Sequence, residues 1–159
     1  MSIDCHLKLN GVSGESTHKD HKDEIAVVSW DWAVANESSV GMGQGSGKGK
    51  ARPGVLTFSH VYDKASPNIA KACASGKHFD DGVLTVRKSG EGQLDFLKVT
   101  MKQVFVTGVT PSATSGGEIT ETITLSYSDI EFEYKPQDDK GKLGGSVKFG
   151  WNVATTETR

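Results

Sequence analysis

Histidines and carboxylates gather in one short polar segment near the N-terminus, where the sequence offers its first set of reactive side chains. His18 and His21 alternate with Asp20 and Asp23, ahead of a strand that we expect to begin near Glu24. Imidazole nitrogens and carboxylate oxygens are common zinc ligands, so a metal site is one interpretation. The histidines lack the helical spacing of a zinc protease, however, and no cysteine lies nearby. We therefore expect a solvated turn and no metal ligands.

His78 and Asp80 form a second pair that could act as a general base with its orienting carboxylate. The pair lies within residues 77–81, which resemble the exit from a helix and imply no pocket. We expect no catalytic residue there.

Glycine-rich stretches suggest phosphate or acyl chemistry, but the required spacing is missing. Residues 41–54 read GMGQGSGKGKARPG, and in a phosphate-binding loop Met42 would have to be glycine and Gly49 a hydroxyl residue. Residues 11–14 resemble a nucleophile elbow, yet Glu15 stands where that motif needs its closing glycine. The sequence therefore predicts no nucleotide or other cofactor.

The elements that would carry these residues are mainly strands, because apolar and polar side chains alternate along most of the chain. We expect seven strands, at residues 3–9, 24–34, 55–62, 82–87, 94–106, 119–134 and 146–153. One short helix is predicted, with Ser66 as N-cap, Pro67 in the first turn and Gly76 after its end.

Two of these strands change the parity of their apolar positions. In residues 119–134 the apolar set moves from odd to even positions near Ser128 and Asp129, and in residues 94–106 it moves near Gln103. One extra residue, a β-bulge that bends the strand, is the simplest explanation in each case. The second strand would span about 40 Å, which favours a bent antiparallel β-barrel over a small sandwich.

The polar faces of the strands predict a wetted surface. Thr122, Thr124 and Ser126, with Glu131 and Glu133 beyond the change of parity, lie opposite the apolar set. Trp30 and Trp32 share one side of their strand and predict core positions, which places Asp31 on the opposite surface.

Composition narrows the class of protein. The 159 residues carry 18 basic and 20 acidic side chains, so the net charge of −2 gives no broad attraction for nucleic acid or anionic lipid. No apolar run reaches the roughly 20 residues of a membrane-spanning helix, and the first residues lack a signal-peptide pattern. We expect one domain over residues 1–159, made in the cytoplasm, with Cys5 and Cys73 as packed, reduced thiols.

The glycine-rich loop of residues 41–54 is long for a compact domain. Loops of this length are usually functional or disordered, so it is either a contact with another chain or a mobile hairpin arm. The candidate contacts with another chain are Gly43, Gly45, Gly47, Lys48, Lys50 and Arg52.

Several stretches, in order, resemble the Hcp (haemolysin-coregulated protein) family of bacterial type VI secretion. They are Gly14-Glu15-Ser16, His21-Lys22-Asp23-Glu24-Ile25, Ser29-Trp30-Asp31-Trp32, residues 63–68 and 74–79, residues 84–88, and residues 133–137 with 148–152. The resemblance implies a structural tube subunit and no enzyme. Six copies would form a ring, and rings would stack into a hollow tube inside a contractile sheath.

The resemblance also implies partners and a route. A spike complex would tip the tube, small effector proteins would occupy its lumen near Asp31, and export would need no signal peptide. The chain stops at Arg159, soon after the last expected strand, so no C-terminal toxin domain is expected. Alternatives are a monomeric β-barrel ligand-binding module or carrier, an enzyme using His18, His21 or His78, and a toxin activity on the chain itself.

Overall fold

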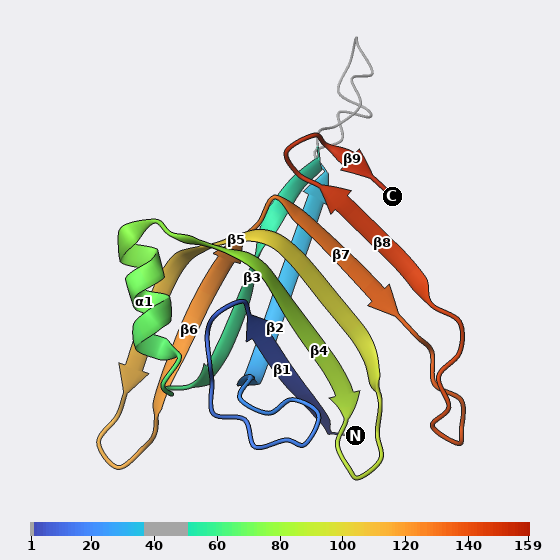
Figure 1. Ribbon diagram of the computed structural model, residues 1–159, viewed down its shortest axis with the longest axis horizontal. Helices are drawn as coiled ribbons and strands as arrows, with labels where there is room; N and C mark the ends of the chain where they lie inside the picture. The colour runs from blue at the N-terminus through green and yellow to red at the C-terminus, as the bar shows by residue number, and fades with distance from the viewer. Residues whose placement is uncertain (1, 37–50) are drawn as a thin grey trace.

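The computed structural model describes residues 2–36 and 51–159, which are mainly β with a single helix (Figure 1). The elements in order are β1 (Ile3–Leu9), β2 (Ile25–Asn36), β3 (Ala51–Val61), α1 (Ser66–Ser75), β4 (His78–Lys88), β5 (Asp95–Ala113), β6 (Ile119–Ser126), β7 (Asp129–Tyr134), β8 (Val147–Asn152) and β9 (Glu157–Thr158).

The strands form one antiparallel sheet that closes on itself. Their order is β4-β1-β2-β3-β6-β5-β7-β8-β9, and a further pairing of β4 with β5 closes the first six into a barrel. β5 has 19 residues, and it pairs along one edge with β4 and along the other with β7 and then β6. Strands β7, β8 and β9 extend beyond the barrel as a wing (Figure 1). The predicted bent barrel is confirmed.

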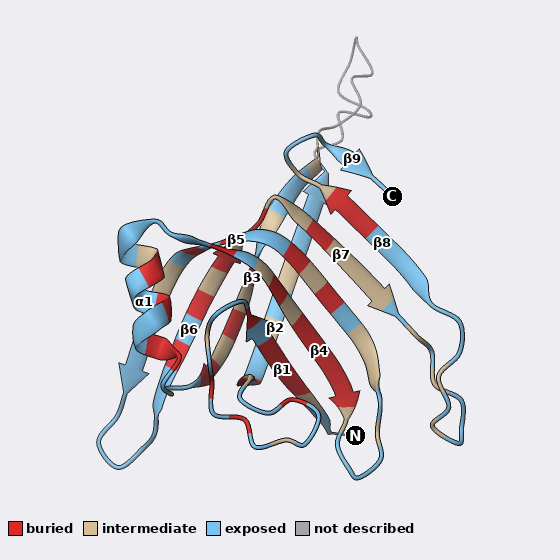
Figure 2. Ribbon diagram, in the orientation of Figure 1, coloured by how far each residue is buried: buried red, intermediate tan, exposed pale blue. Residues whose placement is uncertain are grey.

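The core lies inside the barrel, and buried positions alternate with exposed ones along its strands (Figure 2). Its largest fully enclosed side chains include Leu7, Leu9, Ile25, Leu56, Phe58, Leu84, Met101, Ile123, Leu125 and Ile130. Ile69 of α1 joins them. Burying a side chain of this size contributes about 1.5–3 kcal/mol, so this single core accounts for most of the stabilisation.

The change of parity is confirmed, but the predicted bulges are wrong. β5 buries Val99 and Met101 and then Val104 and Val106, and Gln103 between them has a left-handed φ of 49°. Pairing with β7 and β6 nevertheless continues in one register, with Lys102 opposite Asp129 and Phe105 opposite Ser126. A bulge would give one strand an extra residue and shift this register.

The register survives because neighbouring strands change parity together. Tyr127 and Ser128 interrupt β6 and β7 beside Gln103, and the buried positions move from Tyr127 to Ile130. In β4 the buried positions also change parity, from Phe79 at an odd position to Leu84 at an even one. The sheet therefore folds along a line that crosses three strands, which we call the crease. β5 does have two register shifts, but neither lies at the crease. One follows Val106 in the pairing of β5 with β6, and the other lies at the start of β5 in its pairing with β4.

The two tryptophans are half-buried and pack against the core, so their predicted core position holds in part. The Trp32 indole donates a hydrogen bond of 2.6 Å to the Tyr127 hydroxyl, which donates one of 2.7 Å to the Gly54 carbonyl. The Trp32 ring also lies 4.8 Å from that of Phe132 and 6.2 Å from that of Phe149. These contacts attach the wing to β2 and β3.

The ends of the helix differ partly from expectation. Ser66 is the first residue of α1 and not its N-cap, which is Ala65 without a capping side chain. Asp63 takes over part of that role by accepting the Ala65 N–H at 2.9 Å. Gly76 ends the helix with a φ of 72°, as predicted, because glycine adopts this conformation without steric cost.

Other boundaries also differ. β4 begins at His78, so residues 77–81 are not simply a helix exit, and β3 begins at Ala51, so the last four residues of the glycine-rich segment belong to a strand. Cys5 is buried and Cys73 half-buried, both as free thiols. In the described part of the chain, no helix has the length and apolar content needed to span a membrane.

The crease yields a test at Gln103. A β-branched residue in a left-handed conformation is strained, so Gln103→Val should lower the free energy of unfolding by about 1–2 kcal/mol although the side chain is exposed. Gln103→Gly should stay within about 1 kcal/mol of the parent, because glycine relieves strain but loses more entropy on folding. Urea unfolding of dilute protein measures both.

Thr100→Val, on the outer side of the same strand, is the matched control and should change stability by less than about 0.5 kcal/mol. Equal losses for Gln103→Val and Thr100→Val would contradict a crease that depends on the Gln103 conformation.

Candidate functional site

Short hydroxyl side chains cover one outer side of the barrel. Register aligns Ser29 with Ser59, and Ser59 with Thr122. The next row runs from Asp31 through Thr57. We call this surface the hydroxyl face, formed by Ser29, Asp31, Thr57, Ser59, Thr107, Thr110, Thr122 and Thr124 of β2, β3, β5 and β6. It confirms that Asp31 lies on an exposed surface opposite the core.

The chemistry of the hydroxyl face suits contact and not catalysis. Its hydroxyls bond to one another, with Ser29 Oγ 2.5 Å from Ser59 Oγ and Thr107 Oγ1 3.0 Å from Thr124 Oγ1. None of the eight side chains is a histidine, lysine or cysteine that could activate a hydroxyl. Asp31 is the one charged group among them.

A second outer surface carries paired charges. We call it the charged face, formed by Lys98, Lys102, Asp129, Glu131, Glu133, Lys148 and Arg159. Lys148 Nζ lies 3.2 Å from Glu133, and their hydrogen bond holds the pKa of Glu133 below its ordinary value. Arg159 donates two bonds of 2.8 and 2.7 Å to Asp129. β5 supplies both faces, and the crease separates them.

Most of the segment that we expected to be a solvated turn is exposed, but that prediction is wrong for His21, which is buried against the barrel. His21 is only 6% exposed, and its ring is stacked on that of His6 with the ring centroids 4.6 Å apart. The His18 ring lies 5.2 Å from His6 and 5.6 Å from His21. We call these three side chains the histidine cluster.

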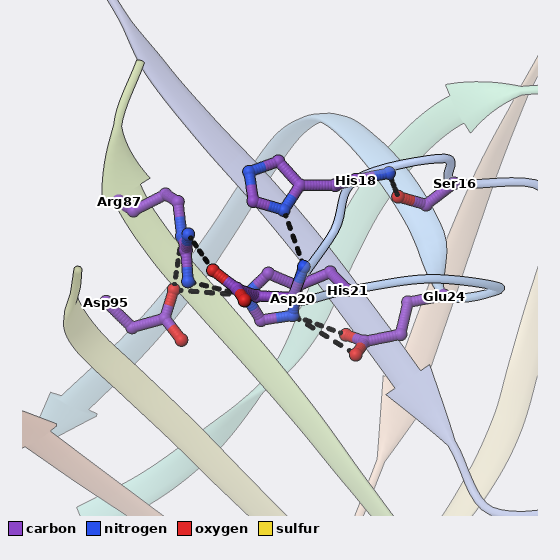
Figure 3. Close-up of polar contacts among 7 residues, drawn as sticks. All are labelled: Ser16, His18, Asp20, His21, Glu24, Arg87 and Asp95. Carbon is purple, nitrogen blue, oxygen red and sulfur yellow. Dashed lines mark hydrogen bonds and ion pairs between the residues drawn. The ribbon is translucent and has the colours of Figure 1, made fainter. Parts of the chain in front are cut away.

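Arg87 of β4 connects this cluster to the sheet (Figure 3). Its Nε donates to Asp95 at 2.8 Å, its Nη1 to Asp20 at 3.0 Å, and its Nη2 lies 3.2 Å from His21 Nε2. The hydrogen bond to Asp95 is the main reason that the pKa of Arg87 is raised, while the same guanidinium lowers the pKa of Asp20. His21 Nδ1 lies 3.0 Å from Glu24.

These contacts hold the loop of residues 10–24, which we call the N-terminal loop, onto β1, β4 and β5. The loop also folds on itself, since the Gly14 N–H donates to the Asp23 carbonyl at 2.7 Å. A β-carbon at Gly14 would lie 2.5 Å from the Glu24 carbonyl oxygen, so this close approach requires glycine. Within residues 2–36 and 51–159, no group of three histidine, cysteine, aspartate or glutamate side chains is arranged to hold a metal ion.

The remaining sequence-predicted residues lie apart from both surfaces or outside the described chain. His78 is exposed at the start of β4, 3.9 Å from Asp80, and its ring lies 5.3 Å from Phe105. Arg52 is exposed in β3, opposite Ala35. The selected positions that lie outside the described residues are Gly43, Gly45, Gly47, Lys48 and Lys50.

Sequence reasoning missed His6, Arg87 and Asp95 as partners of His21. His6 and Arg87 are each 5% exposed, although both occupy the parity opposite the core residues of their strands. Alternation alone therefore predicts that they face solvent, and the sequence carries no local signal that the N-terminal loop covers them.

Comparisons of this chain with known proteins agree on one family. Residues 6–134 match the family model described as "Type VI secretion system effector, Hcp". The protein Hcp1 of Pseudomonas aeruginosa is 42% identical over 157 residues, covering 96% of each chain.

Solved structures agree. A type six secretion system protein superposes with a TM-score of 0.93 at 33% identity, covering 99% of this chain and 100% of the other. Hcp1 from Salmonella typhimurium gives a TM-score of 0.83 at 36% identity, with 100% of both chains covered.

Members of this family are secreted components of the type VI secretion system that form hexameric rings, and they are structural proteins without enzymatic activity. The chain belongs to the Hcp family and is a structural subunit of the type VI secretion tube.

Proposed function

We propose that six copies of this chain form a ring, that rings stack into a hollow tube, and that the hydroxyl face lines its bore. The hydroxyl face carries the proposal, because it is a broad outer surface of short, nearly uncharged side chains on four strands of the barrel. Its short hydroxyl side chains stay hydrated and offer a passing protein little apolar area, although Val55 and Val61 of β3 are exposed at its margins.

The charged face is better suited to the outside of the tube. Its charges form pairs such as Lys148 with Glu133 and Arg159 with Asp129, so it presents fixed polar groups to a partner. In this arrangement the contractile sheath surrounds the ring and the spike complex caps the stack. The subunit leaves the cytoplasm with the tube, which requires no signal peptide.

Asp31 is the residue of the bore through which a small effector protein is held. Its exposed carboxylate stands among hydroxyls that accept or donate hydrogen bonds, so it favours a cationic or N–H-rich surface on the effector. A single charge among neutral groups gives a weak contact, which permits release after delivery.

The glycine-rich segment makes the contacts between subunits or rings in this proposal, through Gly43, Gly45, Gly47, Lys48, Lys50 and Arg52. Support comes from its attachment, because Asn36 pairs with Ala51 at one end of the barrel (Figure 1). A long connection placed at one end can reach an adjoining ring.

Assembly gives the first test. Light scattering coupled to size exclusion should show a species of six chains of 17.0 kDa each, and longer stacks should form as the concentration rises. Monomers alone across a wide range of concentration would contradict the ring and favour the monomeric carrier.

Asp31→Trp tests the bore. The bulky side chain should leave the ring intact and lower retention of a co-expressed effector by at least about tenfold, the change that corresponds to ~1.4 kcal/mol. Asp80→Trp, at an exposed acidic position of β4 away from the hydroxyl face, is the control and should retain the effector. Dissociated rings in Asp31→Trp would instead place Asp31 at a subunit interface.

A further inference from the structure

The histidine cluster joins strand β1 to the N-terminal loop, and two of its three rings, those of His6 and His21, are buried and stacked. His6 comes from β1, whereas His18 and His21 come from the N-terminal loop. The His6 and His21 rings lie 9° from parallel at a centroid distance of 4.6 Å. Histidine is the side chain whose ordinary titration falls nearest to neutral pH, so a buried histidine can make local structure depend on mild acidity.

Charged groups surround the stack from every packed element. Arg87 of β4 contributes a permanent positive charge, and Asp95 of β5 pairs with both Arg87 and His21. Asp20 and Glu24 belong to the N-terminal loop itself, and Asp4 lies on β1 beside His6. The carboxylates are already engaged, since Asp95 and Asp20 bind Arg87 and Glu24 accepts from His21 Nδ1.

The members of the cluster differ in their partners. His21 lies between two carboxylates, with its Nδ1 3.0 Å from Glu24 and its Nε2 3.1 Å from Asp95. His6 has no such flanking pair. His6 Nδ1 is enclosed without a partner, so a charge on that ring would be buried beside Arg87 and two other imidazoles.

We propose that the histidine cluster is an acid-sensitive latch that holds the N-terminal loop on β1 and β4 near neutral pH and releases it in mildly acidic solution while the barrel remains folded. This inference goes beyond assembly of the tube. It predicts where a subunit loosens when it enters an acidic compartment.

The size and sign of the effect follow from His6. Burial, followed by the charges of His21 and His18, lowers its pKa from 6.5 to about 4. The closed loop therefore binds fewer protons than the open one between these values. Stability of the closed form is complete above 6.5 and falls as the pH drops toward 4. At about pH 5 the opening constant should be about 30-fold higher than at about pH 7.5.

The carboxylates act in a different window. Burial alone would raise the pKa of Asp95, but its hydrogen bonds with Arg87 and His21 bring it below 3.8, and the bond with Arg87 lowers that of Asp20. Their stabilising effect is lost only as the pH falls below that value. The change that the His6 variants remove at about pH 5 therefore reports His6 and not Asp95 or Asp20.

Hydrogen exchange with mass spectrometry tests the latch on the full chain. Amides of residues 10–24 should open about 30-fold more at about pH 5 than at about pH 7.5, after correction for the intrinsic exchange rate, while those of β5 and β6 stay protected. In His6→Phe, which keeps a stacked ring without a titrating nitrogen, the change should fall below about threefold. His6→Gln serves the same purpose if the phenylalanine variant does not fold.

His78→Gln, an exposed histidine outside the cluster, is the matched control and should keep the full change. Two results would overturn the proposal. One is an equal acid response in the parent and in the His6 variants. The other is simultaneous loss of protection in the N-terminal loop and in β5, which would indicate general acid unfolding. Because exchange is read within one chain, these outcomes do not depend on whether rings form.

Discussion

The parity of the strands is the constraint on which the rest of this structure depends. A strand must direct its apolar side chains into one core, yet β4, β5 and the β6–β7 pair each reverse their parity once. Reversal in one strand alone would shift its pairing, whereas reversal in all three at the same level keeps the register and folds the sheet. The barrel and the wing can then cover one core, and the outer surface is divided into the hydroxyl face and the charged face.

Polar groups follow two different rules in this molecule. On the hydroxyl face the polar groups meet water, and their hydrogen bonds with one another change the free energy of folding little. In the histidine cluster His6, His21 and Arg87 are buried, so Arg87 is paired with Asp95 and Asp20, and His21 with Glu24. The first arrangement leaves a smooth surface available to a partner, and the second fixes an irregular loop whose backbone would otherwise be poorly held.

Alternation within a strand is local, so the sequence predicted most strands, the short helix, the reversal of parity and the outward position of Asp31. It could not separate a bulge from a crease, because that depends on what the neighbouring strands do. The burial of His21 depends on Arg87 and Asp95, which are far from it in sequence. Ser66 met the rule for an N-cap, but Asp63 bonds the Ala65 N–H and the helix begins one residue earlier than that rule requires. Placement of Asp31 in a bore, by contrast, rested on resemblance to a family.

The central claim is that the hydroxyl face turns toward the axis of an assembled ring. Electron cryo-microscopy of rings formed by the purified chain measures this most directly. The account predicts that Asp31, Thr57 and Thr124 line the central opening and that the pairs of the charged face lie away from it. Rings in which Glu133 and Lys148 line the opening, with the hydroxyl face turned outward or covered by a neighbouring subunit, would contradict it.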